Sequence, residues 1–132
     1  IKNHNIKSGY GAIVNVASHY GLISPDPRIY TDTKRASSEI YGATKASVIQ
    51  ITKYFSVLFA PYNIRVNSLS PGGIKNKNIQ TKKFMKKYSS RVPLNRMGNT
   101  NDLLTTLVYF SSDWSKYTTG QNIVVDGGLS SK

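Results

Sequence analysis

Two side chains with complementary acid–base chemistry, Tyr41 and Lys45, lie four positions apart in a segment with helical periodicity. In a helix, residues i and i+4 share one face, so the phenol and the ammonium are expected to be neighbours. An ammonium beside a phenol favours the phenolate, which can exchange a proton with an alcohol or a carbonyl near neutral pH. The pair therefore predicts a proton-transfer site, although the same spacing occurs on many helices without a catalytic role.

Polar or glycine-containing segments follow each of three short apolar runs that are typical of buried strands. Ser18 follows residues 12–17, Pro71-Gly72-Gly73 follows residues 64–69, and Asp126-Gly127-Gly128 follows residues 123–125. Ligands of open parallel sheets bind beyond the carboxyl ends of the strands. A serine hydroxyl there can bond the same oxygen as the phenol and hold it in place. Together these residues favour hydride transfer with a coupled proton, although each alone is an ordinary turn residue.

Helical periodicity fills the stretches between the predicted strands. A long helix is expected over Ile40–Ala60, capped by Ser37 or Ser38 and ended by Pro61. A further helix opens at Thr100 and Asp102. Strands that alternate with helices predict an α/β domain with a parallel sheet whose strands are buried on both faces. The apolar face of the long helix is expected to comprise Tyr41, Val48, Ile51, Phe55, Leu58 and Phe59.

The composition limits the class of protein. The length of 132 residues fits a single domain over residues 1–132, and an apolar fraction of 39% is enough for a core. The lack of cysteine excludes disulfides and thiolate metal ligands, and it agrees with a cytoplasmic location. No His and carboxylate cluster has metal-binding spacing, so no metal site is predicted. No apolar run reaches the roughly 20 residues that span a bilayer, and residues 1–9 lack a signal-peptide core, so no membrane association is expected.

The net charge is +12, and seven basic residues without an acidic one fall between Lys75 and Arg91. Such a run is typical of a solvated helix face. A basic lid that attracts an anionic substrate, such as a sugar acid or a sugar phosphate, is a second interpretation. Phe84 and Tyr88, interleaved with the lysines, suit either a nucleic-acid stacking platform or i, i+4 packing on a buried face. We favour the packing, and we predict no nucleic-acid partner because no known nucleic-acid-binding pattern is present.

Four segments carry a family resemblance: residues 11–18 (GAIVNVAS), 41–45 (YGATK), 64–74 (IRVNSLSPGGI) and 119–128 (TGQNIVVDGG). Taken in this order, they resemble the short-chain dehydrogenase/reductase family, and Pro93-Leu94-Asn95-Arg96-Met97 resembles its Pro-Leu-x-Arg stretch. The resemblance implies a Rossmann-like doubly wound parallel sheet, of which this chain holds the C-terminal portion, about three strands with flanking helices. It also implies NAD or NADP as the cofactor. The Asp126-Gly127-Gly128 ending resembles the compact single-domain branch of the family.

The resemblance further implies a role for each matching residue. Tyr41 matches the general acid/base, Lys45 the residue that favours the phenolate and bonds the nicotinamide ribose, and Ser18 the residue that orients the substrate. Pro71, Gly72 and the backbone of Ile74 match the turn beside the nicotinamide ring, and Asn67 matches a structural residue. The predicted catalytic residues are Ser18, Tyr41 and Lys45; the cofactor-binding residues are Tyr41, Lys45, Pro71, Gly72 and Ile74; the substrate-binding residues are Ser18, His19, Tyr41 and Gly73.

The sequence departs from the family pattern in two places. The spacing between Ser18 and Tyr41 is longer than usual, because the loop includes Ser24-Pro25-Asp26-Pro27-Arg28-Ile29-Tyr30. This insertion resembles flagellin-modification or surface-glycan oxidoreductases, and its place beside the site suggests a role in substrate binding. No glycine-rich dinucleotide-binding turn occurs, so we expect the N-terminal half of the family's domain to be absent from this chain. A sheet cut to three strands would leave an unpaired edge along residues 13–16.

These observations predict an NAD(P)-dependent oxidoreductase that acts on a hydroxyl or carbonyl group of a small polar, anionic or sugar-like substrate. A homo-oligomer through the Ile40–Ala60 helix is expected, as the resemblance implies. The first alternative is a catalytically incompetent fragment that serves only as a dimerising or structural module. The second is a basic nucleic-acid-binding module, which the charge alone suggests.

Overall fold

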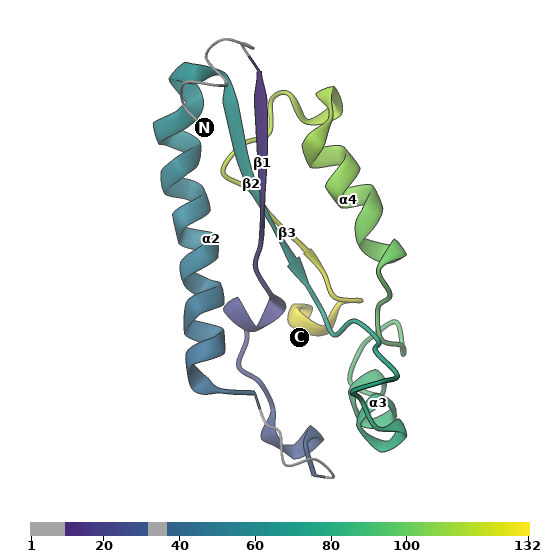
Figure 1. The fold of residues 1–132 in the computed structure, drawn as a ribbon. Coiled ribbons are helices and arrows are strands. Elements are labelled where there is room, and N and C mark those ends of the chain that lie inside the picture. Colours follow the sequence, from purple (N-terminus) through teal and green to yellow (C-terminus); the bar gives the residue numbers. More distant parts are fainter. Residues whose placement is uncertain (1–9, 32–36) are drawn as a thin grey trace.

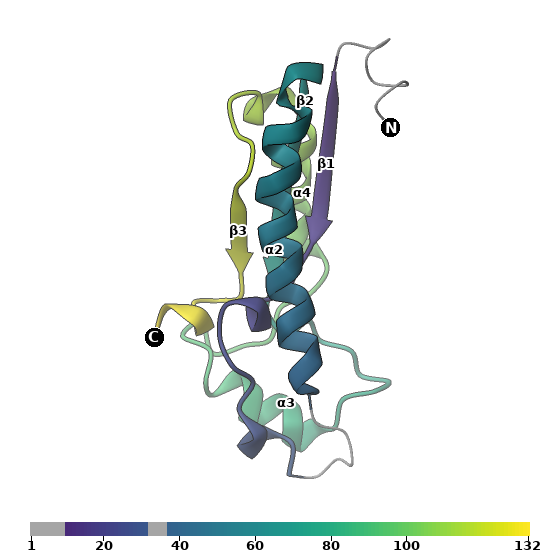
Figure 2. The same cartoon turned by 90° about the vertical axis from the view of Figure 1, so that its left-hand side faces the viewer.

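The computed structural model describes residues 10–31 and 37–132. Three parallel strands form one sheet in the order β1–β2–β3, with β2 in the centre. Helix α2 covers one face of this sheet and α4 covers the other, so the described part of the chain has three layers (Figures 1 and 2). This arrangement confirms the predicted α/β fold with a parallel sheet and flanking helices. The bounds are β1 Gly11–Val16, α2 Glu39–Phe59, β2 Ile64–Pro71, α4 Asn101–Ser111 and β3 Asn122–Val125.

Shorter elements gather near the carboxyl ends of the strands. Helix α3 (Lys82–Ser89) lies there in Figure 1 and is the helical part of the basic segment. Two 3-10 helices precede α2, η1 at His19–Gly21 and η2 at Pro27–Ile29. Because β1 and β2 are parallel, the segments that leave both strands meet at this end of the sheet. The remaining 3-10 helices are η3 Ala60–Tyr62, η4 Asp113–Ser115 and η5 Leu129–Ser131.

Helix α2 begins where its capping signal predicts, but only part of the predicted apolar face packs on the sheet. The Ser38 hydroxyl accepts a hydrogen bond from the Ile40 amide at 3.1 Å, which confirms the capping prediction. The buried residues of α2 are Thr52 and Ser56, and Asn15 of β1 donates to the Thr52 hydroxyl at 2.9 Å. Of the predicted apolar face, Val48, Phe55 and Phe59 are half-buried, whereas Tyr41, Ile51 and Leu58 are exposed. The prediction was therefore right for one half of that face and wrong for the other.

The strands differ in burial, which corrects the expectation that all of them are buried on both faces. Seven consecutive residues of β2, from Ile64 to Ser70, are buried because the strand has a neighbour on each edge and a helix on each face. Strands β1 and β3 are half-buried, and Val16 is 55% exposed. Within the described residues β1 pairs with β2 alone, and the unpaired edge along residues 13–16 stays a prediction.

Apolar side chains are buried between the layers and also near the carboxyl ends of the strands. Those between the layers include Ile64, Val66 and Leu69 of β2 and the fully buried Phe110 of α4. A cluster near the carboxyl ends of the strands joins η2 to the segment around α3, through Ile29, Tyr88, Val92 and Met97. No helix in the described residues is both long enough and apolar enough to span a bilayer.

Candidate active site

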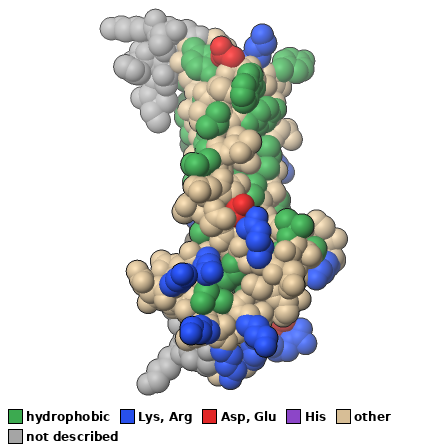
Figure 3. Space-filling view, turned by 90° about the vertical axis from the view of Figure 1, so that its right-hand side faces the viewer, with side chains coloured by type: hydrophobic (Ala, Val, Ile, Leu, Met, Phe, Trp, Pro, Cys, Tyr) green, Lys and Arg blue, Asp and Glu red, His purple; other side chains and the backbone are tan. Residues whose placement is uncertain are grey.

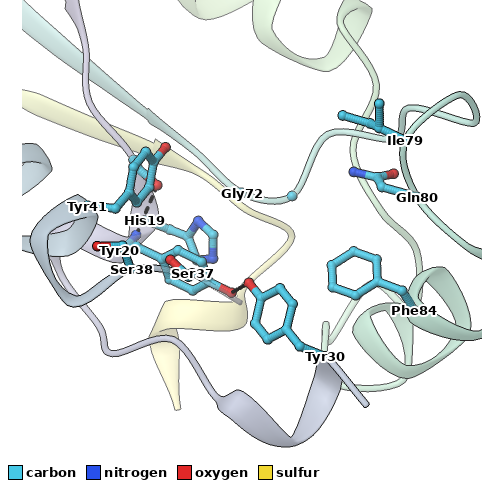
Figure 4. A pocket seen from close by; sticks show the side chains of 12 residues that line it. His19, Tyr20, Tyr30, Ser37, Ser38, Tyr41, Gly72, Ile79, Gln80 and Phe84 are labelled. Atoms are coloured by element: carbon cyan, nitrogen blue, oxygen red, sulfur yellow. Dashed lines mark hydrogen bonds between the residues drawn. The ribbon is translucent and has the colours of Figure 1, made fainter. Parts of the chain in front are cut away.

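A pocket of about 600 Å³ opens beyond the carboxyl ends of β1 and β2 (Figure 4). Five of the predicted site residues line it, whereas Lys45, Pro71 and Ile74 do not. Its size falls within the range of roughly 300–1,000 Å³ that is usual for small-molecule sites. The described lining residues are Ser18, His19, Tyr20, Tyr30, Ser37, Ser38, Tyr41, Gly72, Gly73, Ile79, Gln80 and Phe84.

The first turn of α2 positions Tyr41. Its amide donates to the carbonyl of Ser38 at 3.1 Å, so the capping residue also fixes the backbone that carries the phenol. The side chain is 42% exposed and meets Tyr20 edge-on, with 6.5 Å between the ring centroids. Tyr41 thus presents its ring to the open pocket, where its hydroxyl can reach a ligand.

Two glycines let η1 lie directly against α2. A Cβ atom on Gly21 would come within 2.8 Å of the backbone of Lys45 and Ala46, and one on Gly42 would come within 2.9 Å of the Tyr20 carbonyl. Only hydrogen fits in such close contacts between main chains. This close approach brings Ser18, the capping residue of η1, into the same pocket as Tyr41.

Lys45 lies one helical turn beyond Tyr41, as the i, i+4 spacing predicts. Its ammonium is 5.8 Å from the centroid of the Tyr41 ring and donates a hydrogen bond to the carbonyl of Val16 at 3.0 Å. That bond ties α2 to the last residue of β1. The positive charge is therefore held beside the phenol at the carboxyl end of the strand.

Ser18 and His19 continue from β1 and are both buried. The Ser18 hydroxyl oxygen accepts a hydrogen bond from the Tyr20 amide at 3.1 Å, so its own hydrogen can be donated into the pocket. His19 bonds the Pro71 carbonyl through Nδ1 at 3.0 Å, and burial lowers the pKa of its imidazole. A buried, neutral imidazole suits a structural role at the base of the pocket better than proton transfer at its surface.

The turn after β2 is held by backbone contacts on both sides. Gly72 donates to the carbonyl of Val125 at 2.9 Å, and Gly98 donates to the carbonyl of Gly73 at 3.0 Å. Ile74 pairs with Gly98 in a parallel bridge, and its carbonyl accepts a bond from the Gln80 side chain at 2.9 Å. The predicted nicotinamide-side turn is thus a fixed wall of the pocket. Asn67, buried in β2, bonds Thr118 and Gln121 through its amide, in agreement with the predicted structural role.

Aromatic side chains form a wall that the sequence interpretation did not assign to the site. The hydroxyls of Tyr20 and Tyr30 lie 3.2 Å apart, and the Tyr30 ring packs on Phe84 with 5.4 Å between centroids (Figure 4). Burial is the main cause that raises the pKa of Tyr20, so this phenol stays protonated. Tyr30 belongs to the insertion between Ser18 and Tyr41, and its place in the wall supports the predicted role of that loop. Only the loop's position in the chain could have indicated this contact.

Ion pairs fasten the insertion to the segment around α3. Asp26 accepts hydrogen bonds from the side chains of Arg28 and Arg91, and the Arg28 guanidinium is the main cause that lowers the pKa of its carboxyl. Lys87 of α3 donates to the Arg28 carbonyl at 3.4 Å and to the hydroxyl of Thr31, directly after the insertion, at 2.7 Å. These bonds join the insertion to α3 and to Arg91 just after it, more than fifty positions away, so the two segments form one wall of the pocket.

The basic side chains lie outside the pocket. None of the seven basic residues between positions 75 and 91 lines it, and Lys and Arg side chains gather at the end of the face in Figure 3 where α3 lies. Tyr88 is buried and Phe84 is half-buried, which confirms the predicted i, i+4 packing. These rings are therefore not available as an exposed stacking platform. Among residues 10–31 and 37–132, no group of three His, Cys, Asp or Glu residues could hold a metal ion.

The fold and the pocket define a Rossmann-like α/β class with Ser, Tyr and Lys at the carboxyl edge of a parallel sheet. The family model described as enoyl-(acyl carrier protein) reductase matches residues 3–130. The chain belongs to the short-chain dehydrogenase/reductase family and represents its C-terminal portion. The resemblance predicted from the sequence is therefore confirmed.

Three similar proteins illustrate the range of this family. Post-translational flagellin modification protein A of Campylobacter coli is 36% identical over 122 residues, which cover 92% of this chain and 47% of the relative. A short-chain dehydrogenase structure from Leptospira borgpetersenii with bound NAD+ is 42% identical, has a TM-score of 0.88, and is matched over 98% of this chain and 48% of its own. A gluconate 5-dehydrogenase structure from Burkholderia cenocepacia with NADP and tartrate is 28% identical, with a TM-score of 0.83 and coverage of 98% and 49%. The chain thus spans about half the length of the relatives that it matches.

Proposed function

We propose that this chain carries the proton-transfer and substrate-binding part of an NAD(P)-dependent oxidoreductase. The enzyme would transfer a hydride between a nicotinamide cofactor and a hydroxyl or carbonyl group of a small polar substrate. One observation carries the proposal: Ser18 and Tyr41 line one pocket, with the Lys45 ammonium 5.8 Å from the phenol ring and the Pro71–Gly73 turn opposite. Membership of the family supports the same reaction type.

The residues present fit the nicotinamide-ribose end of NAD or NADP. The Tyr41 hydroxyl and the Lys45 ammonium can both donate to a sugar diol, and they lie at the strand edge where dinucleotides bind in such sheets. The turn at Gly72 and Gly73 offers a flat main-chain surface, free of side chains, for a ring. Structural relatives with NAD+ and with NADP support either cofactor.

The side chains of this chain would handle the proton. The bound nicotinamide supplies the hydride acceptor for oxidation, or the hydride donor for reduction. In oxidation, the Tyr41 phenolate takes the proton of the substrate alcohol as that hydride leaves the carbon, and in reduction the phenol returns a proton to the carbonyl oxygen. Ser18 donates a hydrogen bond to the same oxygen, and Lys45 places its positive charge beside the Tyr41 ring.

The substrate we propose is small and polyhydroxylated, with or without an anionic group. The gluconate 5-dehydrogenase among the structural relatives, which contains tartrate, supports this class. The basic residues around α3 lie outside the pocket, so they would act by attracting an anionic substrate from solution and not by pairing with it inside. Higher ionic strength should then slow the association of an anionic substrate with the protein, while the contacts of the bound substrate stay the same.

Tyr41→Phe tests the assignment, since it keeps the ring and removes only the hydroxyl. We expect the variant still to bind NADH or NADPH, with the affinity reduced by the loss of one hydrogen bond to the ribose, while turnover of sugar acids and polyols falls by about 10²–10⁴-fold. Tyr54→Phe is the matched control, because Tyr54 lies on the same helix and is 64% exposed. Full turnover by Tyr41→Phe would exclude Tyr41 as the acid/base.

A second candidate function is a dimerising module without catalysis. Ile40, Ile51, Tyr54 and Leu58 form an exposed apolar stripe along α2, opposite the buried Ser56. We infer that two copies of the chain associate through this stripe. Sedimentation should then show a dimer that Ile51→Lys converts to a monomer, whereas a monomer at all concentrations excludes self-association. A dimer that binds neither NADH nor NADPH would favour this module over the enzyme.

A further inference from the structure

The turn between β2 and Ile74 is bonded by two side chains from elsewhere in the chain. The Gly73 amide donates to the hydroxyl of Tyr88 at 2.6 Å, and this hydroxyl lies 3.3 Å from Nε2 of His19. The other ring nitrogen of His19, Nδ1, lies 3.0 Å from the Pro71 carbonyl. Both ends of the turn are therefore held by one closed set of hydrogen bonds that passes through a phenol and an imidazole.

The chemistry of the partners fixes the direction of each bond. A carbonyl oxygen only accepts, so the hydrogen of the imidazole lies on Nδ1 and is donated to Pro71. Nε2 of the neutral ring is then an acceptor, which leaves Tyr88 as the donor to His19. Because the Tyr88 oxygen also accepts from Gly73, every polar atom of this set has a partner. Burial raises the pKa of Tyr88 to about 12 and lowers the pKa of His19, so both groups are neutral in the range where this pattern holds.

We propose that Tyr88 and His19 are positioning residues. They fix the position of the Pro71–Gly73 turn relative to the nicotinamide, and they connect that turn to the aromatic wall. The inference rests on the proposed function, and it adds two residues that the proton-transfer reaction does not use. We call the set of Gly73, Tyr88, His19 and Pro71 the turn clamp.

The turn is thin, which makes its position sensitive to the clamp. Gly72 and Gly73 line the pocket of about 600 Å³ and also a second pocket of about 230 Å³ behind it. The turn therefore separates two open spaces. A Cβ atom on Gly73 would lie 2.5 Å from the Tyr88 ring, so the phenol rests directly on the main chain of the turn. Loss of the hydroxyl leaves the Gly73 amide without this acceptor, so the backbone bonds to Val125 and Gly98 then hold the turn without the clamp.

The same phenol connects the turn to the aromatic wall. Phe84 lies one helical turn before Tyr88 on α3 and lines the substrate side of the pocket, with 6.0 Å between the two ring centroids. The Tyr88 ring also packs edge-on against His19, whose ring is tilted against that of Tyr20 with 4.0 Å between the centroids. A shift of α3 would thus move the wall that contacts the substrate and the turn that faces the cofactor together. The clamp makes the relative position of the two ligands a property of this chain.

Tyr88→Phe removes only the hydroxyl of the clamp. We expect hydrogen exchange of the Gly73 amide to accelerate by about tenfold or more, as for the loss of one buried hydrogen bond, and NADH affinity to fall severalfold. Tyr109→Phe is the matched control, because it also removes a bonded tyrosine hydroxyl, 3.0 Å from Thr118, but lies outside the pocket. His19→Asn keeps a donor near the position of Nδ1 and should retain more NADH affinity than His19→Leu.

The outcomes separate the inference from the proposed function. Unchanged Gly73 exchange in Tyr88→Phe overturns the clamp. Faster exchange with unchanged NADH affinity overturns the positioning role and leaves the bond a structural one. If the unaltered chain binds neither NADH nor NADPH, the proposed function fails and the positioning role fails with it. Faster exchange, weaker binding and an inert Tyr109→Phe together support the proposal.

Discussion

Replacement of Arg65 by methionine tests how the central strand is held against α4. Arg65 lies in β2 and is only 7% exposed. Its Nη1 donates to the Phe110 carbonyl at 3.0 Å and to the Ser115 hydroxyl at 2.7 Å, and Nη2 donates to the Ser112 carbonyl at 3.1 Å. The guanidinium therefore satisfies carbonyls at the C-terminus of α4, where the helix dipole favours a cation.

The magnitude follows from the groups that the substitution leaves behind. Methionine fills much of the volume of the arginine stem but donates nothing, so the Phe110 carbonyl, the Ser112 carbonyl, the Ser115 hydroxyl and the Tyr10 hydroxyl each lose one hydrogen bond, while Ser112 and Ser115 keep the bond between them. Each lost bond contributes about 1 kcal/mol. Removal of the buried guanidinium offsets part of this loss in free energy, because Nε of Arg65 is buried and has no hydrogen-bond partner among the described residues. We expect a net loss of about 2–3 kcal/mol in the free energy of unfolding.

Urea unfolding followed by circular dichroism measures this loss. With a slope of about 2 kcal/mol/M, the midpoint should fall by roughly 1–1.5 M while the slope stays constant. Arg96→Met is the matched control, since the Arg96 side chain is 53% exposed and pairs with Asp102 at the surface, where ion pairs contribute little. Equal midpoints for the two variants would refute the reasoning, because burial would then make no difference to the value of the same side chain.

Two further substitutions test the turn clamp by independent means. Gly73→Ala should lower both the melting temperature and NADH affinity, because its Cβ would lie 2.5 Å from the Tyr88 ring, whereas Gly98→Ala meets only the flexible end of Ile74 and should be mild. Burial lowers the pKa of His19 in the folded chain. As the pH falls below about 6.5, this imidazole therefore takes up a proton in the unfolded chain before it does so in the folded chain. The free energy of unfolding then falls by up to ~1.4 kcal/mol per pH unit until the pH reaches the folded pKa. Asp126 offsets part of this burial effect. Urea midpoints between pH 7 and pH 5 should show this decline, and His19→Gln should flatten it; an equal decline in both proteins would contradict the assignment.

Local signals in the sequence predicted the elements and much of the site. The Ser38 cap and Pro61 predicted the bounds of α2 to within one residue. Both signals are reliable because a capping side chain and a proline ring act directly on the adjacent backbone. The apolar runs predicted the strands for the same reason. Ser18, Tyr41 and the Gly72-Gly73 turn meet because parallel strands end at one edge, which is a rule of topology.

Contacts between distant segments could not be read in this way. Tyr88 and His19 are 69 positions apart, and nothing in their spacing indicates that they share a hydrogen bond. The centre of the buried face of α2 was also missed, because Thr52 and Ser56 are buried for their small size and not for their hydrophobicity. Periodicity identifies the apolar positions of a helix, but it does not show which of them pack against another element.

The two sides of the pocket differ in how many contacts within the described residues hold them in place. On the side of the aromatic wall, Tyr20, Tyr30 and Phe84 are held by contacts within the described residues, and the bond from Lys87 to the Arg28 carbonyl ties the insertion to α3. The other side ends at β1, which pairs with β2 alone among the described residues and whose Val16 is 55% exposed. Because Lys45 is anchored to that same Val16, a strand added along β1 would change the surroundings of the ammonium while leaving the aromatic wall unchanged. Under the proposed function, substrate selectivity would therefore depend on the aromatic wall, and cofactor affinity would respond to a strand placed along β1.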